Sequence, residues 1–301
     1  MDAIDRGIAF LAGRQLAYGE FQTFAGSGRV MRVQYAYSSP FITTFILYAL
    51  RGITHPELEF MREKAVRFLL HEQEPGGIWR NHTRANTLHQ QYRLPPDLDD
   101  ISTVSYTLQS NGVPFDDNHS LIRHNRNDQG LFQTWIDPPF ANEIDAVVNA
   151  NVLLYLGENI PAVCAYINQV IRNNEPFSKW YPDKLAFYYM VSRAFANGIA
   201  GLGQSKEPVV DDIRRCQLPD GSFGNDLQTA MALTTLLNFV HVDEMVQAGI
   251  AHLLNRQDTN GSWSIAPFFN GFKMFYGSAE LTAAIAVEAL KKYASYGMRR
   301  R

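Results

Sequence analysis

The chain has 301 residues, of which 46% are hydrophobic and 19% are charged, so it can bury a sizeable core. A net charge of -3 excludes the basic surface that nucleic-acid binding needs, and two cysteines are too few for a disulfide framework. No stretch reaches the about 20 apolar residues that span a bilayer, and Asp2 and Asp5 are unlike the start of a signal peptide. We therefore expect a cytoplasmic protein with no nucleic-acid partner and no transmembrane segment.

The predicted elements are helices of two kinds that alternate along the chain. Helices of the first kind carry charge on one face, as outer helices do, at 5–15, 61–73, 116–126, 161–172, 208–217 and 244–257. Each is followed by a helix that is apolar around most of its circumference, at 39–50, 97–108, 143–156, 182–195, 225–237 and 278–290. An apolar circumference indicates burial on every side. Six outer and six inner helices predict an all-α fold, an (α/α)6 toroid, with residues 1–301 as a single domain. An open solenoid is the alternative, but it would need polar capping repeats at both ends.

Five of the outer helices end in one repeated pattern, in which a Gly follows a Gln, replaced once by Arg, by four residues and an aromatic follows it by six. The copies are Gln15, Gly19 and Phe21; Gln73, Gly77 and Trp79; Arg126, Gly130 and Phe132; Gln217, Gly221 and Phe223; and Gln257, Gly261 and Trp263. This pattern resembles the QW repeat of squalene cyclases and other class II terpene cyclases, whose toroid is shared with protein prenyltransferase β subunits. The resemblance runs from Gly7 to about Tyr293. It implies that the Gln and aromatic side chains tie neighbouring helix pairs together.

Three carboxylates within four residues, Asp97, Asp99 and Asp100, open the second inner helix. One Asp would cap the helix, whereas three repel one another, and repulsion and burial raise the pKa of at least one. A carboxylic acid that stays protonated in an apolar pocket can protonate an alkene. The motif resembles the DxDD signature of class II terpene cyclases, which implies that Asp99 donates the proton while Asp97 and Asp100 tune and orient it. We expect the acids that open other inner helices to act mostly as caps: Glu143, Asp145, Asp183, Asp226 and Glu280.

Aromatic residues cluster just before the inner helices and in their first turns, where they would either line a cavity or plug the mouth of the toroid. Aromatic faces stabilise a carbocation by up to ~2 kcal/mol per ring when desolvated. The candidate substrate-binding aromatics are Tyr37, Phe41, Trp135, Trp180, Tyr181, Phe272 and Tyr276. Three arginines in the insert before the acidic motif would clamp a diphosphate or remain solvated: Arg80, Arg84 and Arg93. No metal site and no cofactor is expected, apart from Mg²⁺ if the substrate carries a diphosphate.

The sequence thus predicts a class II terpene cyclase-like isomerase that protonates an alkene of a linear isoprenoid, its small-molecule partner. A non-catalytic isoprenoid-binding or scaffold toroid is the main alternative. A protein prenyltransferase relative is disfavoured because Gln228 and Glu280 stand where that family has Cys and His zinc ligands. A glycan-cleaving enzyme would pair Asp99 with Asp145 or Asp226. Class II cyclases generally enclose the substrate between two toroidal domains, and this chain supplies one. Either its own central cavity suffices, or a second copy of this chain (a homodimer) or another partner closes the cavity, or activity is lost.

Overall fold

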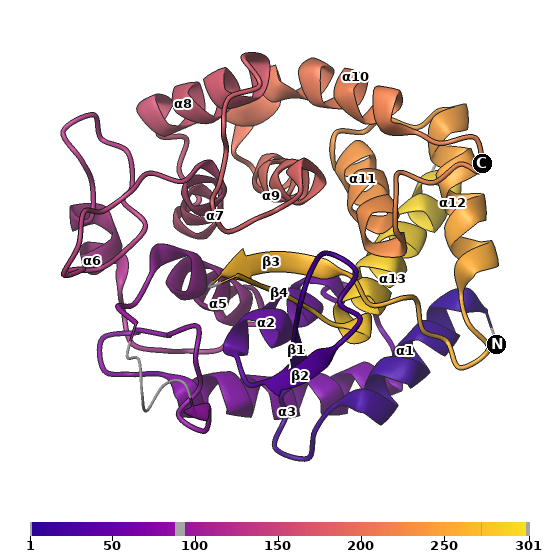
Figure 1. The fold of residues 1–301 in the computed structure, drawn as a ribbon, viewed down its shortest axis with the longest axis horizontal. Helices are drawn as coiled ribbons and strands as arrows, with labels where there is room; N and C mark the ends of the chain where they lie inside the picture. Colours follow the sequence, from indigo (N-terminus) through magenta and orange to yellow (C-terminus); the bar gives the residue numbers. More distant parts are fainter. Residues whose placement is uncertain (1, 88–93, 272, 299–301) are drawn as a thin grey trace.

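Six helices make a closed circuit at the centre of the computed structural model, which describes residues 2–87, 94–271 and 273–298. Each contacts the next in chain order, and the last contacts the first, so that the described helices surround a common axis (Figure 1). They are α2 (Pro40–Ala49), α5 (Leu98–Ser110), α7 (Ala146–Leu156), α9 (Lys184–Ala196), α11 (Asp226–Asn238) and α13 (Ala279–Met298). These helices correspond to the six predicted inner segments.

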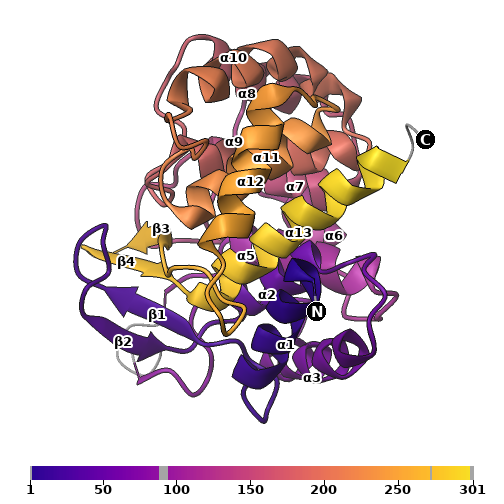
Figure 2. The same cartoon turned by 90° about the vertical axis from the view of Figure 1, so that its right-hand side faces the viewer.

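The remaining described helices lie outside this circuit, as the charge on one face predicts for all but the short η1, which was not predicted (Figures 1 and 2). They are α1 (Ala3–Arg14), α3 (Pro56–Glu72), α6 (His119–His124), α8 (Pro161–Arg172), the short 3-10 helix η1 (Ala200–Ser205), α10 (Lys206–Cys216) and α12 (Glu244–Arg256). The helix predicted at 116–126 is shorter in the structure, where α6 begins after Asn118. The side-chain amide of Asn118 donates to the carbonyl of Gly77 and to the hydroxyl of Ser105 instead of capping this helix. No helix in the described ranges is long and apolar enough to cross a membrane.

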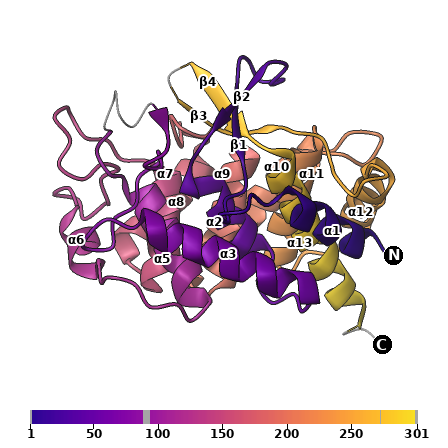
Figure 3. The same cartoon turned by 90° about the horizontal axis from the view of Figure 1, so that it is seen from below.

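The all-α prediction is wrong in one respect, because a small antiparallel sheet covers the end at which the inner helices begin (Figure 3). Its strands run in the order β2 (Gln34–Tyr37), β1 (Thr23–Gly26), β4 (Met274–Gly277), β3 (Pro267–Gly271). Phe24 of β1 pairs with Gly277 of β4, so the sheet joins two distant parts of the chain. Four-residue strands with so remote a partner leave no local periodicity in the sequence.

The repeated glutamines join neighbouring outer helices, as the repeat implies. Gln15, at the end of α1, donates its side-chain amide to the carbonyl of Gly19 and to that of Met61 on α3, both at 2.9 Å. Gln257, at the end of α12, reaches the carbonyl of Ala3 on α1 at 2.9 Å. Gln217 makes the same pair of contacts, with the carbonyls of Gly221 and of Met245 on α12, so these three glutamines each fix the turn after their own helix and hold the next helix in place.

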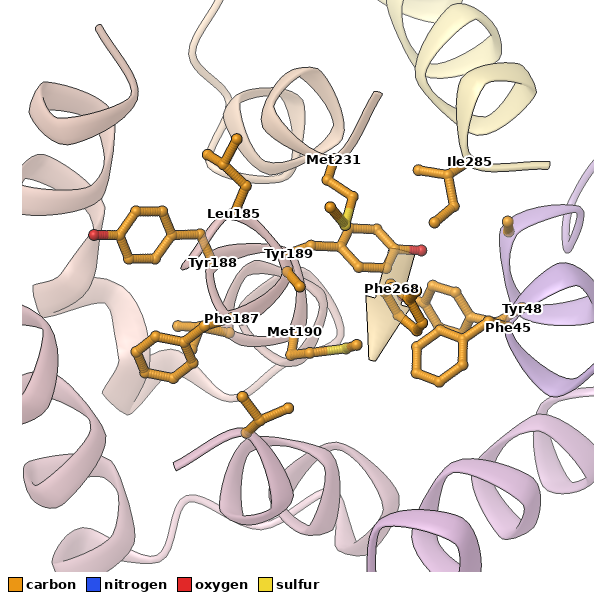
Figure 4. Packing of buried hydrophobic residues seen from close by; sticks show 14 of the residues in the cluster. Phe45, Tyr48, Leu185, Phe187, Tyr188, Tyr189, Met190, Met231, Phe268 and Ile285 are labelled. Atoms are coloured by element: carbon orange, nitrogen blue, oxygen red, sulfur yellow. The ribbon is translucent and has the colours of Figure 1, made fainter. Parts of the chain in front are cut away.

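The middle of the ring, between the two ends of the inner helices, is filled by side chains rather than hollow (Figure 4). Phe268 of β3 reaches into the centre, where its ring centroid lies 4.9 Å from that of Phe45 on α2. Tyr189, Met190 and Met231 approach the same centre from α9 and α11. This packing separates the pocket beneath the sheet from a second hollow at the opposite end of the ring, where the inner helices end.

Candidate active site

A pocket opens at the ends of the ring where the inner helices begin. Its empty volume is about 630 Å³, which includes solvent space at the open mouth. The sequence-predicted residues that line it are Tyr37, Phe41, Asp97, Asp99, Asp100, Trp135, Trp180, Tyr181 and Tyr276. The unpredicted lining residues include Asn81, Thr134, Val148 and Asn270.

Aromatic side chains from four separate segments form the pocket walls. Tyr276 of β4 stacks on Phe269 of β3 at 4.8 Å between ring centroids and also lies 4.7 Å from Tyr37. Trp135 and Trp180 meet edge to face at 5.5 Å on another wall. The sheet that the sequence did not predict therefore supplies one side of the pocket.

Asp99 is the most accessible of the three acids, and its accessible surface lines the pocket. One carboxyl oxygen, Oδ2, accepts a hydrogen bond from the hydroxyl of Tyr181, and the other, Oδ1, accepts one from the amide of Asn151, both at 2.6 Å. Burial raises the pKa of Asp99, while these two donors and the charge of Arg193 act to lower it. The site thus favours retention of a proton but also stabilises the carboxylate that remains after its loss.

Asp97 and Asp100 form a buried pair beside Asp99 in the pocket lining. Asp97 caps α5 by accepting the backbone N–H of Asp100 at 2.8 Å. Burial and the neighbouring Asp99 raise the pKa of Asp97 to about 7. Burial and the Asp97 carboxyl raise the pKa of Asp100 well above its usual value. Two acids this close cannot both ionise easily, so the pair holds a proton at neutral pH.

Asp145 shows that a raised pKa in this region is not confined to the acidic motif. Its Oδ1 caps α7 by accepting the backbone N–H of Val147 at 2.8 Å, and its Oδ2 accepts the hydroxyl of Ser178 at 2.5 Å. Burial, with a smaller contribution from Asp99, raises the pKa of Asp145 to about 7. Asp183 likewise caps α9, as expected, whereas Asn225 rather than Asp226 caps α11.

The raised pKa of Asp145 predicts a pH-dependent effect of Asp145→Asn on stability. Between about pH 4 and pH 7 the folded protein keeps a proton that the unfolded chain releases, so this group's contribution to stability falls as pH rises. The loss is at most about 1.4 kcal/mol per pH unit. Asn still caps the helix but cannot ionise, so the variant should gain stability relative to the wild type as pH rises through this window. Urea unfolding of both proteins at several pH values measures the difference, and a constant difference would contradict the prediction.

The predicted diphosphate clamp is not among the described pocket-lining residues. Arg80 pairs with Glu74 at 2.8 Å and donates to the carbonyl of Leu94 at 2.5 Å. Arg84 donates to the carbonyl of Gln73 at 2.8 Å. These arginines therefore hold the loop before the acidic motif, and a role in binding diphosphate stays a prediction. Two further candidates lie outside the described residues: Arg93 and Phe272.

Comparisons with known proteins give likeness at the level of structure. No protein-family model matches the sequence, and a search among curated proteins finds no relative. The type II terpene cyclase MstE from Scytonema has a TM-score of 0.70 at 17% identity, over 97% of this chain and 98% of its own. ent-Copalyl diphosphate synthase from Streptomyces platensis has a TM-score of 0.63 at 16% identity, over 85% of this chain and 50% of its own.

A similar arrangement of helices also occurs in a possible member of the GH105 family from Salmonella enterica. Its TM-score is 0.58 at 11% identity, over 98% of this chain and 93% of its own. The likeness to the two cyclases is greater, and it agrees with the resemblance carried by the repeat and the acidic motif. At these identities the comparison establishes the fold alone, and the fold of this chain is that of the type II terpene cyclases.

Proposed function

We propose that this protein is a class II terpene cyclase-like enzyme in which Asp99 starts cyclisation of a linear isoprenoid by protonating an alkene. The observation that carries the proposal is the position of Asp99, which is accessible inside an aromatic-lined pocket. Asp97 and Asp100 tune the acidity of Asp99. The closed circuit of inner helices supports an (α/α)6 toroid, carrying a small sheet, in which residues 1–301 form one domain.

In the proposed reaction the carboxyl proton of Asp99 passes to one alkene carbon and leaves a cation on the other. A second alkene of the same chain attacks this cation and closes a ring. A water molecule at the pocket mouth then accepts a proton from carbon, which restores an alkene, and Asp99 regains its proton from solvent. After the proton has left, Tyr181 and Asn151 stabilise the Asp99 carboxylate by donating hydrogen bonds to it. The rings of Phe41 and Trp135 offer π faces to the cation in place of water.

MstE supports both the substrate class and the size of the proposed enzyme. A variant of MstE has been solved in complex with its substrate, geranylgeranyl dihydroxybenzoate. Because MstE matches this chain over nearly the full length of both, a terpene cyclase can be built at this size. A homodimer or another partner that closes the cavity stays a prediction.

The described lining of the pocket carries three Asp side chains and no Lys or Arg. A lining of this kind favours an uncharged polyene end of the substrate next to Asp99. We propose that any anionic head group binds outside this lining. Proton transfer from a carboxyl group calls for no cofactor, so we propose Mg²⁺ only as a companion of a diphosphate substrate.

The two carboxylates that a glycan-cleaving enzyme would pair with Asp99 are engaged in other contacts. Asp145 caps α7 and is absent from the described pocket lining. Asp226 accepts the backbone N–H of Ser264 at 3.0 Å and is paired with Arg256. Neither acid is free to act across a glycosidic bond from Asp99.

The proposal is tested by incubating the purified protein with geranylgeranyl diphosphate, squalene and geranylgeranyl dihydroxybenzoate, each in H₂O and in D₂O. Cyclisation is an isomerisation, so the product keeps the mass of the substrate or of its dephosphorylated form but elutes differently. In D₂O it should carry one added deuterium, because the exchangeable proton of Asp99 enters the product. Binding without any product would overturn the enzyme proposal and favour the isoprenoid-binding alternative.

A further inference from the structure

Arg193 is a buried cation in the interior of the ring. It lies on α9 with only 2% of its surface exposed. Its guanidinium carbon lies 4.1 Å from the ring centroid of Tyr48 and 4.6 Å from that of Phe45, two rings that appear together in Figure 4. Burying a guanidinium costs several kcal/mol unless its surroundings compensate. The contacts of the Arg193 guanidinium therefore indicate the role of its charge.

Arg193 is connected to Asp99 through a single neutral side chain. Its Nη2 donates to Oδ1 of Asn151 at 3.0 Å, and Nδ2 of Asn151 donates to Oδ1 of Asp99 at 2.6 Å. A guanidinium only donates hydrogen bonds, so it requires the carbonyl oxygen of the Asn151 amide to face it. The amide N–H is thereby turned toward Asp99. A flipped amide would set N–H against N–H on one side and oxygen against oxygen on the other.

We propose that Arg193 is a positioning residue for the acid Asp99. Through Asn151 it keeps a donor on one carboxyl oxygen, and its fixed charge stabilises the carboxylate that remains when the proton has left. Arg193 is absent from the described pocket lining, so its charge lies behind the acid and away from the cation that forms in the pocket. This inference rests on the proposed role of Asp99 as proton donor.

The groups around both residues determine the sign of the expected effect. Asp99 faces Tyr181 and Asn151 as donors, with the acids Asp97 and Asp145 nearby. Apart from Asn151, Arg193 faces the rings of Phe45, Tyr48 and Tyr189; Arg51 lies over Tyr48, and the Tyr189 hydroxyl donates to Glu288 at 2.8 Å. Removing the Arg193 charge leaves only the hydrogen bonds from Tyr181 and Asn151 to oppose burial and like charges at Asp99. The pKa of Asp99 should then rise, and Asp99 becomes a weaker acid.

The test follows the protonated carboxyl of Asp99 by infrared difference spectroscopy during a pH titration, with Asp99→Asn to assign the band. Arg193→Met should raise the pKa of Asp99 by about one unit, and Arg193→Lys should raise it less because the charge remains. Tyr189→Phe is the matched control: it keeps the aromatic ring, removes the bond to Glu288 and should leave the Asp99 titration unchanged. Product formation by Arg193→Met should fall by up to about tenfold, with partial recovery in Arg193→Lys.

The titration and the turnover separate two kinds of failure. An unchanged Asp99 titration in Arg193→Met would overturn the role of Arg193, whether or not the wild type makes product. A raised pKa together with no product from the wild type would keep the electrostatic link and overturn the enzyme proposal. If Arg193→Met does not fold, Asn151→Ala removes the same donor and should raise the pKa of Asp99 while the Arg193 charge stays; no rise there contradicts the inference.

Discussion

Asp99→Asn should abolish cyclisation while leaving the fold and substrate binding nearly intact. The amide is close in size to the carboxyl and stays in the first turn of α5, whose cap is Asp97, so stability should change by no more than about 1 kcal/mol. It cannot protonate an alkene, and general acid catalysis alone typically contributes ~10²–10⁴-fold. The measurement is product formation by wild type and variant under one condition, together with binding of the same substrate. Equal turnover in the two proteins would rule out Asp99 as the proton donor.

Matched variants locate the effect at this one acid. Asp97→Asn and Asp100→Asn should be milder, because those side chains tune the donor rather than replace it. Asp145→Asn should keep turnover within a small factor, since Asp145 is buried nearby but is not among the described lining residues. With a substrate that has no diphosphate, added chelator should leave turnover unchanged. A loss of turnover in Asp145→Asn as large as that in Asp99→Asn would point to a general electrostatic disturbance.

Gly261→Ala should destabilise the fold severely, because the turn after α12 touches the backbone of α1. Gly261 has φ +89°, and an added Cβ would lie 2.2 Å from the carbonyl oxygen of Arg6, well inside van der Waals contact. The side chain would have to push α1 away from the turn that Gln257 also holds. We expect a loss of more than about 3 kcal/mol in the free energy of unfolding, measured by urea denaturation.

Gly130→Ala is the control for backbone strain alone. Gly130 occupies the equivalent turn with φ +77°, but an added Cβ there meets no atom within 4 Å. Only the left-handed conformation is then unfavourable, which costs about 1 kcal/mol. Similar losses in the two variants would mean that contact between the turn and α1 contributes little to stability.

The helices could be predicted because their signals are local. The helix predicted at 161–172 is α8 with the same bounds, since one apolar face and a proline at its first position mark it within the segment itself. The sheet could not be predicted in the same way. The four residues of β1 form a strand by pairing with β4, about 250 residues further along the chain. No sequence pattern within either strand indicates this pairing.

The site divides along similar lines. The three Asp residues and most of the lining aromatics were predictable because their positions relative to the helix starts bring them to one mouth. Asn151 and Arg193 were missed because they lie inside helices that were interpreted as apolar throughout. The sequence did contain a usable signal, namely a charged residue within a helix that was predicted to be buried on every side. Such a side chain requires a partner. An arginine in such a helix is therefore a candidate for a role in the site.

The contacts between α1 and α13, and between β1 and β4, also govern the order of events on the ribosome. The segment that contains α1 and β1 leaves the exit tunnel before its partners α13 and β4, which are translated some 250 residues later. Until then α1 lacks the neighbour that covers its apolar face, and one wall of the pocket does not exist. Contacts of such long sequence separation slow folding and lengthen the exposure of unpaired surfaces. A nascent chain of this protein should therefore depend on chaperones until α13 emerges.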